Sequence, residues 1–514
     1  MKKETSMKYT IGIDVGTSGT KTALFDRNGV KIGSVTYNYP LSQPHNGWAE
    51  QNPEDWYDAV VRGLRDMCAM VPSGDIAGVG LSGQMHGLVL LDRDGRVIRP
   101  SIIWCDQRTA EECAVLTELV GKERLMELTK SPAVTGFTAS KILWVKRHEP
   151  ENFARAATIL LPKDYIRYRL SGVFATDVSD ASGMQLLDIE KRDWSDEILE
   201  KLGLNRSMLG RVYESAELSA RVSEEAAMQT GLAAGVPIAA GAGDNAASAI
   251  GCGVVRDGQA FVTIGTSGVV FAHTSKLSVD PMGRMHSFCS AVPGEYHVMG
   301  VTQAAGLSLQ WFRNEFCRAE TERAAELRLD PYVVMDSEAA EVPIGARGLL
   351  YMPYLMGERS PWLDPHIRGS FLGLSASHTR ADLIRAVMEG VTYSLKDCLN
   401  LMEQTGVEID SMMACGGGGS SPLWRQMLAD VFGCEVHTAT SNEGGALGAA
   451  ILAMVASGLY STPADACGAI VRYRTTQSPL EQNREPYARM YALYSRAYEA
   501  IAPLSHDLSK FETH

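Results

Sequence analysis

The chain of 514 residues is longer than one hydrophobic core usually supports, so we expect two domains of about 250 residues each. Its 45% apolar and 21% charged residues are typical of a globular protein in water, and the net charge of -13 argues against nucleic acid or an anionic membrane surface as the main partner. The ten scattered cysteines form no Cys-x-x-Cys pair and no His/Cys cluster, which favours reduced thiols in a cytoplasmic protein over disulfides or a zinc site.

Residues 1–6 are polar and lack an apolar core, so we expect a disordered N-terminal extension rather than a signal peptide. The longest apolar run, Ala446 to Val455, is too short to cross a bilayer and predicts a buried helix. We therefore expect no membrane partner.

The first predicted element is a hairpin. Tyr9 to Val15 reads as an apolar strand, Gly16-Thr17-Ser18-Gly19 as a tight turn, and Thr20 to Phe25 as a second strand. A further turn leads to Val30 to Tyr37, so three strands form an antiparallel meander at the start of a mixed sheet. The turn matters for function, because its glycines expose backbone N–H groups and its hydroxyls add donors for phosphate oxygens.

The same turn occurs again as Gly265-Thr266-Ser267-Gly268, between the predicted strands Phe261 to Ile264 and Val269 to His273. One copy alone reads as a hairpin whose glycines supply positive φ. Two copies in separate halves favour a nucleotide held between two related domains. Asp14, beside the first turn, either caps that turn or faces a metal-bound nucleotide, since a carboxylate would repel bare phosphate.

A polar loop, Ser82 to Gly87, lies between the predicted strands Ile76 to Leu81 and Leu88 to Leu91. A loop mounted on a rigid support suits recognition, and the adjacent Gln84 and His86 favour a hydroxyl-rich substrate over a histidine satisfied in the core.

Trp104 and Asp106 follow the next strand and are further candidates for the substrate site. Asp106 has an alternative role, because it could cap the helix that begins there and pair with Arg108.

The middle of the chain carries the strongest candidate for catalysis. Val236 to Gly241 reads as a strand, and Asp244-Asn245 precedes the helical run Ala246 to Ile250. Asp244 is either an N-cap or a general base close to a nucleotide, and the second phosphate turn shortly after it supports the base.

Later in the chain, a glycine run ending at Ser421 connects a strand end to the predicted helix Leu423 to Phe432. Its N–H groups and the helix N-terminus suit ribose or phosphate, although a plain connection also tolerates glycine. The final segment, Glu485 to Leu504, has tyrosines at helical spacing and predicts a packed helix.

These motifs resemble the FGGY carbohydrate kinases over nearly the whole chain after Ser6. The resemblance rests on Asp14 to Lys21, Gly136 to Trp144, Gly243 to Ala247, Gly265 to Gly268 and the stretch from Gly369 through Glu389. It implies the two-domain α/β ATPase fold of actin, Hsp70 and hexokinase, which is ribonuclease H-like, with a cleft between duplicated domains. Within the family, Gly83 to Gly87 and Leu161 to Tyr165 are similar to the D-xylulose kinases.

The resemblance also implies an activity, the ATP-dependent phosphorylation of D-xylulose, with Asp244 as base and Asp14 orienting Mg2+. The alternatives are another FGGY kinase for ribulose, gluconate or glycerol, and a non-catalytic sugar sensor. It places Met85, His86 and Asn245 at the sugar, beside the candidates Gln84, Trp104 and Asp106. The implied nucleotide contacts are Thr17, Ser18, Lys21, Gly265, Thr266, Gly306, Gln310, Gly416, Gly417 and Ser421.

For domain organisation, we expect a sugar-binding N-terminal domain over 7–255, a nucleotide-binding C-terminal domain over 256–485, and a closing helix over 486–514. A homodimer is an expectation taken from the family alone.

Overall fold

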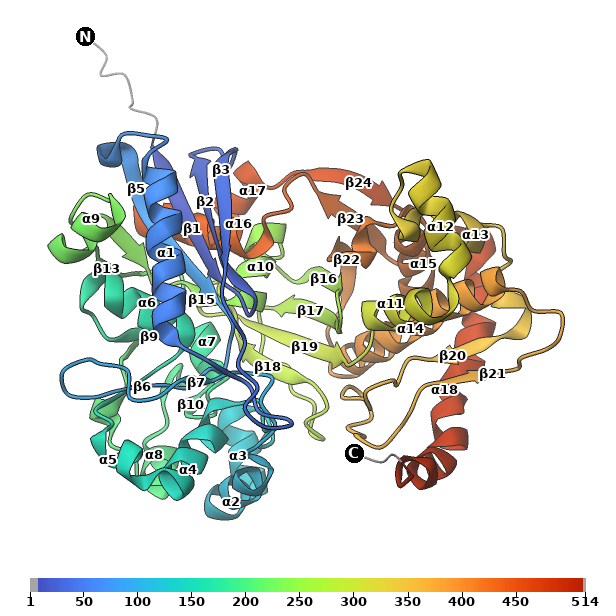
Figure 1. Ribbon diagram of the computed structural model, residues 1–514, viewed down its shortest axis with the longest axis horizontal. Helices are drawn as coiled ribbons and strands as arrows, with labels where there is room; N and C mark the ends of the chain where they lie inside the picture. Colours follow the sequence, from blue (N-terminus) through green and yellow to red (C-terminus); the bar gives the residue numbers. More distant parts are fainter. Residues whose placement is uncertain (1–7, 512–514) are drawn as a thin grey trace, which may run out of the picture.

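In the computed structural model, which describes residues 8–511, two seven-stranded sheets stand in the two halves of the molecule (Figure 1). The expected extension over residues 1–6 lies outside the described residues. The first sheet has the order β13 (Leu218–Arg221), β14 (Pro237–Ala239), β5 (Ile76–Gly83), β1 (Tyr9–Val15), β2 (Gly19–Asp26) and β3 (Lys31–Asn38), with β15 (Ala242–Gly243) beside β5. The second has the order β18 (His286–Cys289), β19 (Tyr296–Thr302), β17 (Gly268–Thr274), β16 (Gly258–Ile264), β22 (Ile409–Cys415), β23 (Glu435–Ala439) and β24 (Tyr473–Gln477).

Each sheet is built around one of the two predicted hairpins, so the duplication extends to the topology. Strand β1 pairs antiparallel with β2 and parallel with β5, and β16 pairs antiparallel with β17 and parallel with β22. A third antiparallel strand, β3 or β19, continues each hairpin. The predicted meander and the second hairpin are therefore confirmed.

Two-stranded pairs and helices cover these sheets. The small pairs are β4 (Glu50–Gln51) with β7 (Ser101–Ile102), β6 (Val89–Leu91) with β8 (Thr158–Leu160), β9 (Ala175–Asp177) with β12 (Arg211–Tyr213), β10 (Leu187–Asp188) with β11 (Asp193–Trp194), and β20 (Leu350–Met352) with β21 (Ser370–Leu372). Helices of the first half are α1 (Pro53–Cys68), α2 (Ala110–Val120), α3 (Lys122–Thr129), α4 (Thr138–His148), α5 (Pro150–Arg155), α6 (Pro162–Ser171), α7 (Val178–Ser182), α8 (Asp196–Leu202), α9 (Glu224–Thr230) and α10 (Asp244–Cys252). Those that follow are α11 (Gly306–Phe316), α12 (Arg318–Leu327), α13 (Pro331–Ala340), α14 (Arg380–Gln404), α15 (Pro422–Phe432), α16 (Gly444–Ala456), α17 (Pro463–Ile470) and α18 (Glu481–Ser509).

Helix α16 comes from the late part of the chain, yet it packs on β1 and β5 of the first sheet and beside α10. Its residues Gly445 to Met454 are buried, which confirms the buried helix predicted from the apolar run. Small residues allow this close approach. A Cβ placed on Gly448 would stand 1.8 Å from the backbone oxygen of Ala247 in α10. The packing of α16 therefore fixes the position of α10, the helix that begins at Asp244.

The last helix, α18, begins at Glu481 and buries Tyr487 and Tyr494. Two further tyrosines donate hydrogen bonds to acids, Tyr491 to Asp397 at 2.5 Å and Tyr498 to Asp364 at 2.8 Å. The tyrosine spacing thus marks a packed helix, as the sequence predicts.

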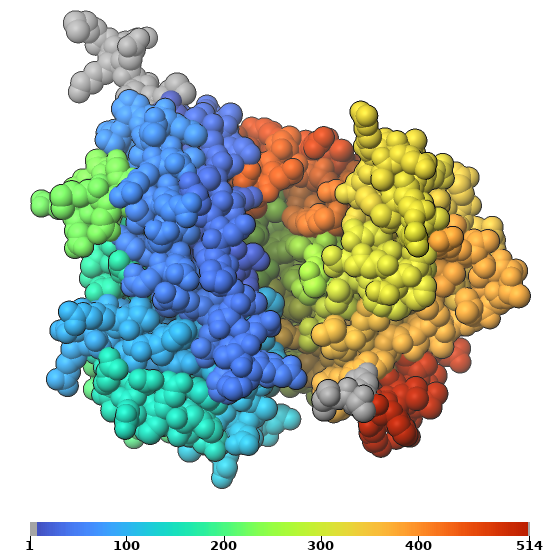
Figure 2. Space-filling view, viewed as in Figure 1, coloured from blue at the N-terminus to red at the C-terminus, as the bar shows by residue number. Residues whose placement is uncertain are grey.

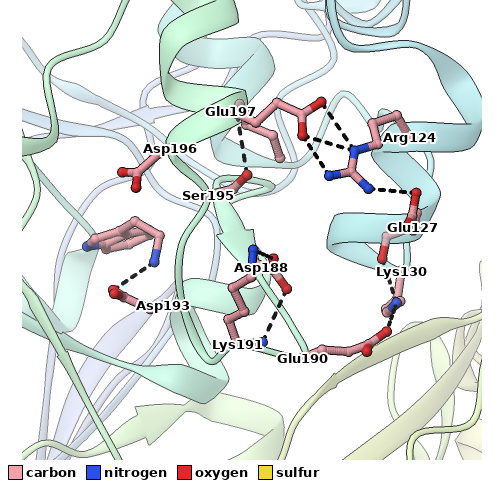
Figure 3. A network of polar contacts seen from close by, with 12 residues as sticks. Arg124, Glu127, Lys130, Asp188, Glu190, Lys191, Asp193, Ser195, Asp196 and Glu197 are labelled. Atoms are coloured by element: carbon pink, nitrogen blue, oxygen red, sulfur yellow. Dashed lines mark hydrogen bonds and ion pairs between the residues drawn. The ribbon is translucent and has the colours of Figure 1, made fainter.

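A charged network ties α3, the β10–β11 pair and α8 together at the edge of the first half (Figure 3). Arg124 forms ion pairs with Glu127 and Glu197, both at 2.7 Å. These side chains are substantially exposed, so each pair contributes little to stability.

All ten cysteines are free thiols, in agreement with the sequence. Among the helices of residues 8–511, none has the length and apolar character needed to cross a membrane.

The contact between α10 and α16 predicts a strong effect of a single methyl group. In Gly448→Ala the new Cβ would collide with backbone rather than with a flexible side chain, so the helices must separate. We expect a loss of about 1–3 kcal/mol in the free energy of unfolding. The matched control is Gly468→Ala in α17, where nothing lies within 4 Å of the new Cβ and helix propensity favours alanine. Scanning calorimetry should show a lowered melting temperature for the first variant only, and equal melting temperatures would contradict this packing argument.

Candidate active site

Asp244 is the first residue of α10 and one of its carboxylate oxygens is held by the neighbouring residue. Its Oδ1 accepts hydrogen bonds from the backbone N–H of Asn245 at 2.7 Å and from Asn245 Nδ2 at 3.0 Å. The N-cap position is Gly243, which has no side chain to cap the helix, so the interpretation of Asp244 as an N-cap is wrong. Oδ2 accepts no hydrogen bond from the described residues, which leaves it available to a ligand.

Asp14, at the C-terminal part of β1, is the electrostatic neighbour of Asp244. Burial raises the pKa of Asp244 to about 7, and the negative charge of Asp14 adds to this effect. Burial also raises the pKa of Asp14, whereas the hydrogen bond from Ser82 Oγ to Asp14 Oδ1 at 2.7 Å and the charge of Lys21 oppose the rise. Strand β1 and helix α10 thus bring together the two acids that the sequence analysis selected.

The first phosphate turn is rigidly supported. Tyr39 donates a hydrogen bond from its hydroxyl to the backbone oxygen of Gly16 at 2.5 Å. Ser18 is exposed at the tip of the turn, and Thr17 Oγ1 accepts a hydrogen bond from Trp104 Nε1 at 2.9 Å. Lys21, a predicted phosphate contact, forms an ion pair with Glu443 at 3.2 Å. Trp104 is partly exposed beside this turn, so it stays a candidate for ligand contact.

Two predicted substrate contacts are structural instead. Gln84 is 1% exposed, donates from Nε2 to Gln51 Oε1 at 2.9 Å, and accepts from Thr17 Oγ1 at 3.4 Å. It therefore supports the phosphate turn from behind. Asp106 is fully buried, pairs with Arg108 at 2.7 Å, and accepts from the backbone N–H of Ala49. Both assignments to the sugar are corrected, because neither side chain has an unused polar atom facing a ligand.

His86 adopts a left-handed backbone conformation with φ of 69°. Its Nδ1 lies 2.9 Å from the backbone oxygen of Gly183, which assigns the proton to Nδ1 and leaves Nε2 as an acceptor. The ring stacks on Phe137 at 4.3 Å. Burial and the nearby positive charge of Lys141 hold the pKa of His86 well below its usual value, so the imidazole is neutral.

Met85 is buried against Gly243, the residue that precedes Asp244, since a Cβ on this glycine would lie 2.8 Å from Met85 Cγ. The loop that carries Met85 and His86 thus packs directly against the start of α10. Of the expected sugar contacts, Met85, His86 and Asn245 are therefore gathered around Asp244.

One cavity, of about 740 Å³, lies in the first half and is lined by none of the predicted site residues. A second cavity, of about 610 Å³, lies in the second half and is lined by several of the predicted nucleotide residues. The size of the second is in the usual range for a small-molecule site. Figure 2 shows the molecule hollowed between its two halves, with residues from the middle of the chain in the hollow. Predicted residues that line this cavity are Gly265, Thr266, Gly306, Gln310, Gly417 and Ser421. Gly416 and the first-turn residues Thr17, Ser18 and Lys21 are outside its lining.

Sequence reasoning missed several residues of these sites. The cavity wall includes Tyr332 and Asp336 of α13, for which the sequence carries no motif. His286 and Phe288 of β18 join the aromatic group around His86, with ring centroids 5.3 Å between Phe137 and His286 and 6.5 Å between His86 and Phe288. The turn and glycine patterns that predict phosphate contacts give no signal for side chains that other elements bring to these sites.

Comparisons with known proteins agree with this layout. The family model described as FGGY family of carbohydrate kinases, N-terminal domain, matches residues 9–251, and its C-terminal counterpart matches residues 260–457. The chain is 40% identical to xylulose kinase of Escherichia coli over 96% of this chain and 99% of that protein, and 39% identical to xylulose kinase of Bacillus subtilis over 98% and 99%. A "xyloylose kinase" from Brucella ovis has a similar solved structure, with a TM-score of 0.89 at 37% identity over 96% of this chain and 100% of that one.

The raised pKa of Asp244 predicts a pH-dependent cost in stability. An unfolded aspartate titrates near about 3.9, so at intermediate pH the folded protein binds more protons than the unfolded one and stability falls as the pH rises toward the folded pKa. In the protein without nucleotide or metal, Asp244→Asn should raise the melting temperature at about pH 8, with a smaller gain at about pH 5. Asp58→Asn, at a side chain that is 70% exposed, is the control. A pH-independent effect of Asp244→Asn would be inconsistent with this origin.

Proposed function

The chain belongs to the FGGY family of carbohydrate kinases, and we propose that it transfers the γ-phosphoryl group of ATP to D-xylulose, giving D-xylulose 5-phosphate. The choice of sugar is supported by full-length similarity to two proteins named xylulose kinase. The chemistry is supported by one observation above all. Asp244 offers a carboxylate oxygen without a protein partner, at the start of the helix against which the loop of the neutral His86 packs.

Phosphoryl transfer from ATP passes through a loose transition state, so catalysis rests mainly on positioning and electrostatic stabilisation. In the proposed mechanism, Asn245 holds Oδ1 of Asp244, and Oδ2 accepts the hydrogen bond of the attacking sugar hydroxyl. The same oxygen receives the hydroxyl proton late in the transfer. A pKa near 7 suits this task, because the group accepts a proton without being permanently protonated at neutral pH.

The sugar is proposed to lie over Met85 and His86. Nε2 of the neutral His86 accepts a hydrogen bond from a second hydroxyl, and the ring keeps its orientation through Gly183 and Phe137. The adenine and ribose of ATP are proposed to fill the cavity of about 610 Å³. The triphosphate then extends toward the Gly265 to Gly268 turn. The first turn then approaches from the other half, and closure of the halves keeps water away from the phosphoryl group.

Magnesium fits the acidic side of this site. No group of three or more His, Cys, Asp or Glu between residues 8 and 511 is arranged to hold an ion by itself. Mg2+ on a nucleotide needs only one or two carboxylates besides phosphate and water. Asp14 can supply one such carboxylate, and the residue beside it is Gly445, where a Cβ would stand 2.8 Å from Asp14 Oδ2 and crowd the carboxylate. We therefore propose that Asp14, with Asp244 nearby, would hold Mg2+, which when bound would supply positive charge to offset that of the phosphates.

The expected cytoplasmic location is supported by the ten free thiols. The homodimer and the domain boundary near residue 256 stay predictions.

Replacing the proposed base gives the sharpest test of its role. Asp244→Asn keeps the shape of the side chain but removes the charge and the proton acceptor, so we expect kcat to fall by about 10³-fold. ATP affinity should change little, because Asp244 does not line the nucleotide cavity. A coupled assay of ADP release measures the first effect and calorimetric titration the second. A variant that turns over at a near wild-type rate would remove Asp244 from the mechanism, whatever the substrate.

A substrate panel tests the sugar. The same assay with D-xylulose, D-ribulose, gluconate and glycerol should give the highest kcat/KM for D-xylulose, because the choice between such substrates rests on a few hydroxyl contacts. Strong activity on another member of the panel, with little on D-xylulose, would contradict the proposed substrate. The assignment as a carbohydrate kinase would still hold.

A further inference from the structure

Arg359 lies in the second half, in the segment between β20 and β21, and its backbone is anchored on both sides. Glu358 accepts hydrogen bonds from the backbone N–H of Gln303 at 2.8 Å and of Arg359 itself at 2.7 Å. Ser360 donates from its backbone N–H to Val301 O at 3.0 Å and from Oγ to Arg284 O at 2.5 Å. These hydrogen bonds hold the segment against the end of β19 and against the residues that precede β18.

The side chain of Arg359 has no such anchor. Within residues 8–511 its guanidinium forms no hydrogen bond and no ion pair, although the residue is half-buried. The well-buried arginines of this protein all have partners, as the pairs Arg99 with Glu50, Arg108 with Asp106, Arg167 with Asp164, and Arg385 with Glu389 show. Leaving a guanidinium without acceptors in a crowded place is unfavourable. A ligand that brings acceptor oxygens would satisfy it.

The surroundings of Arg359 are those of the proposed sugar site. Arg284, whose backbone oxygen accepts from Ser360, stands two residues before His286. The His286 ring lies 5.3 Å from Phe137, and Phe137 stacks on His86. In agreement with this placement, burial is the main cause of the low pKa of both His86 and His286, and the positive charge of Arg359 adds to it. Arg359 therefore belongs to a segment of the opposite half that is hydrogen-bonded beside the proposed sugar site, close enough for its charge to act on both imidazoles.

The first half offers this site mainly acceptors. Asp244 Oδ2 and His86 Nε2 both accept hydrogen bonds, so they suit sugar hydroxyls, which donate. A ketose also carries a carbonyl oxygen, which only accepts. Three donors near the site already have acceptors within the protein: Lys141 Nζ donates to the backbone oxygens of His86 and Gly136, Trp104 Nε1 donates to Thr17, and Asn245 Nδ2 donates to Asp244.

We propose that Arg359 is a substrate-binding residue that donates hydrogen bonds to the carbonyl oxygen of the ketose and so selects ketoses over the corresponding alcohols. This inference rests on the proposed function, since it assumes a ketose between His86 and Arg359. Because His86 and Arg359 belong to different halves, a sugar that touches both also favours their closure.

The test compares D-xylulose with its two reduced forms, xylitol and D-arabinitol, which lack the carbonyl. In Arg359→Gln, kcat/KM for D-xylulose should fall by about 10²-fold, because the carbonyl loses a charged donor. The inhibition constants of the two alcohols should change by less than about threefold, because they make no such contact. Arg359→Lys keeps a positive donor and should recover part of the loss. Arg318→Gln, at an arginine whose side chain is 92% exposed, is the control.

Each outcome has one meaning. Equal losses for the ketose and the alcohols, or no loss at all, would overturn the role of Arg359 in carbonyl recognition. A fall in kcat with an unchanged dissociation constant for D-xylulose, measured by calorimetry without nucleotide, would also overturn it and assign Arg359 to the phosphoryl group. The melting temperature of each variant shows whether it folds. If Arg359→Gln does not fold, Arg359→Lys is compared with the wild-type protein in its place. Turnover of D-xylulose by the wild-type protein tests the proposed function separately.

Discussion

Two carboxylates that repel each other, Asp14 in β1 and Asp244 at the start of α10, are held in place by the surrounding structure. Asp14 is fixed by β1 and by the hydroxyl of Ser82, while Asp244 is fixed by Asn245 at the start of α10. Helix α16 packs on β1 and approaches α10 so closely that only glycine fits, so a single helix supports both the strand and the helix that carry the two acids. The consequence is an acid with a pKa near 7 and one unused oxygen, which is the property a phosphoryl-transfer base needs.

The two halves contribute different chemical groups to the proposed active site. The first half supplies the acids, the neutral imidazole of His86 and the turn supported by Gln84 and Tyr39. The second half supplies the cavity proposed for the nucleotide and, in Arg359, a guanidinium without a partner among the described residues. The first half offers hydrogen-bond acceptors and the second half offers a donor. In the proposed site, these groups are satisfied together only when a substrate lies between the two halves. This arrangement gives a physical reason for closure before reaction.

Much of the fold could be predicted because its signals are local. Alternating apolar residues and a repeated glycine-bounded turn identify both hairpins, and the two sheets have the same pairing around them. The residues predicted to contact a nucleotide also come together in space, since Gly265, Gly306, Gly417 and their neighbours line one cavity, although their role stays a prediction.

The substrate site was harder to predict, because a polar residue beside a loop has two possible uses. Gln84 and Asp106 resemble ligand contacts in sequence, but partners distant in the chain, Gln51 and Thr17 for Gln84, engage them within the protein. Arg359 gives the opposite case, since only the fold brings its charge close enough to act on His86 and His286. Pairing between distant side chains is decided by tertiary structure, which no local pattern encodes.

The most direct test of this account is a crystal structure of the protein with D-xylulose and a non-hydrolysable ATP analogue. We predict that Asp244 Oδ2 lies within hydrogen-bond distance of the sugar's terminal hydroxyl, with that hydroxyl oxygen in line with the γ-phosphorus. An Asp244 side chain turned away from the sugar, or a sugar bound outside the space between Met85, His86 and Asp244, would contradict the account.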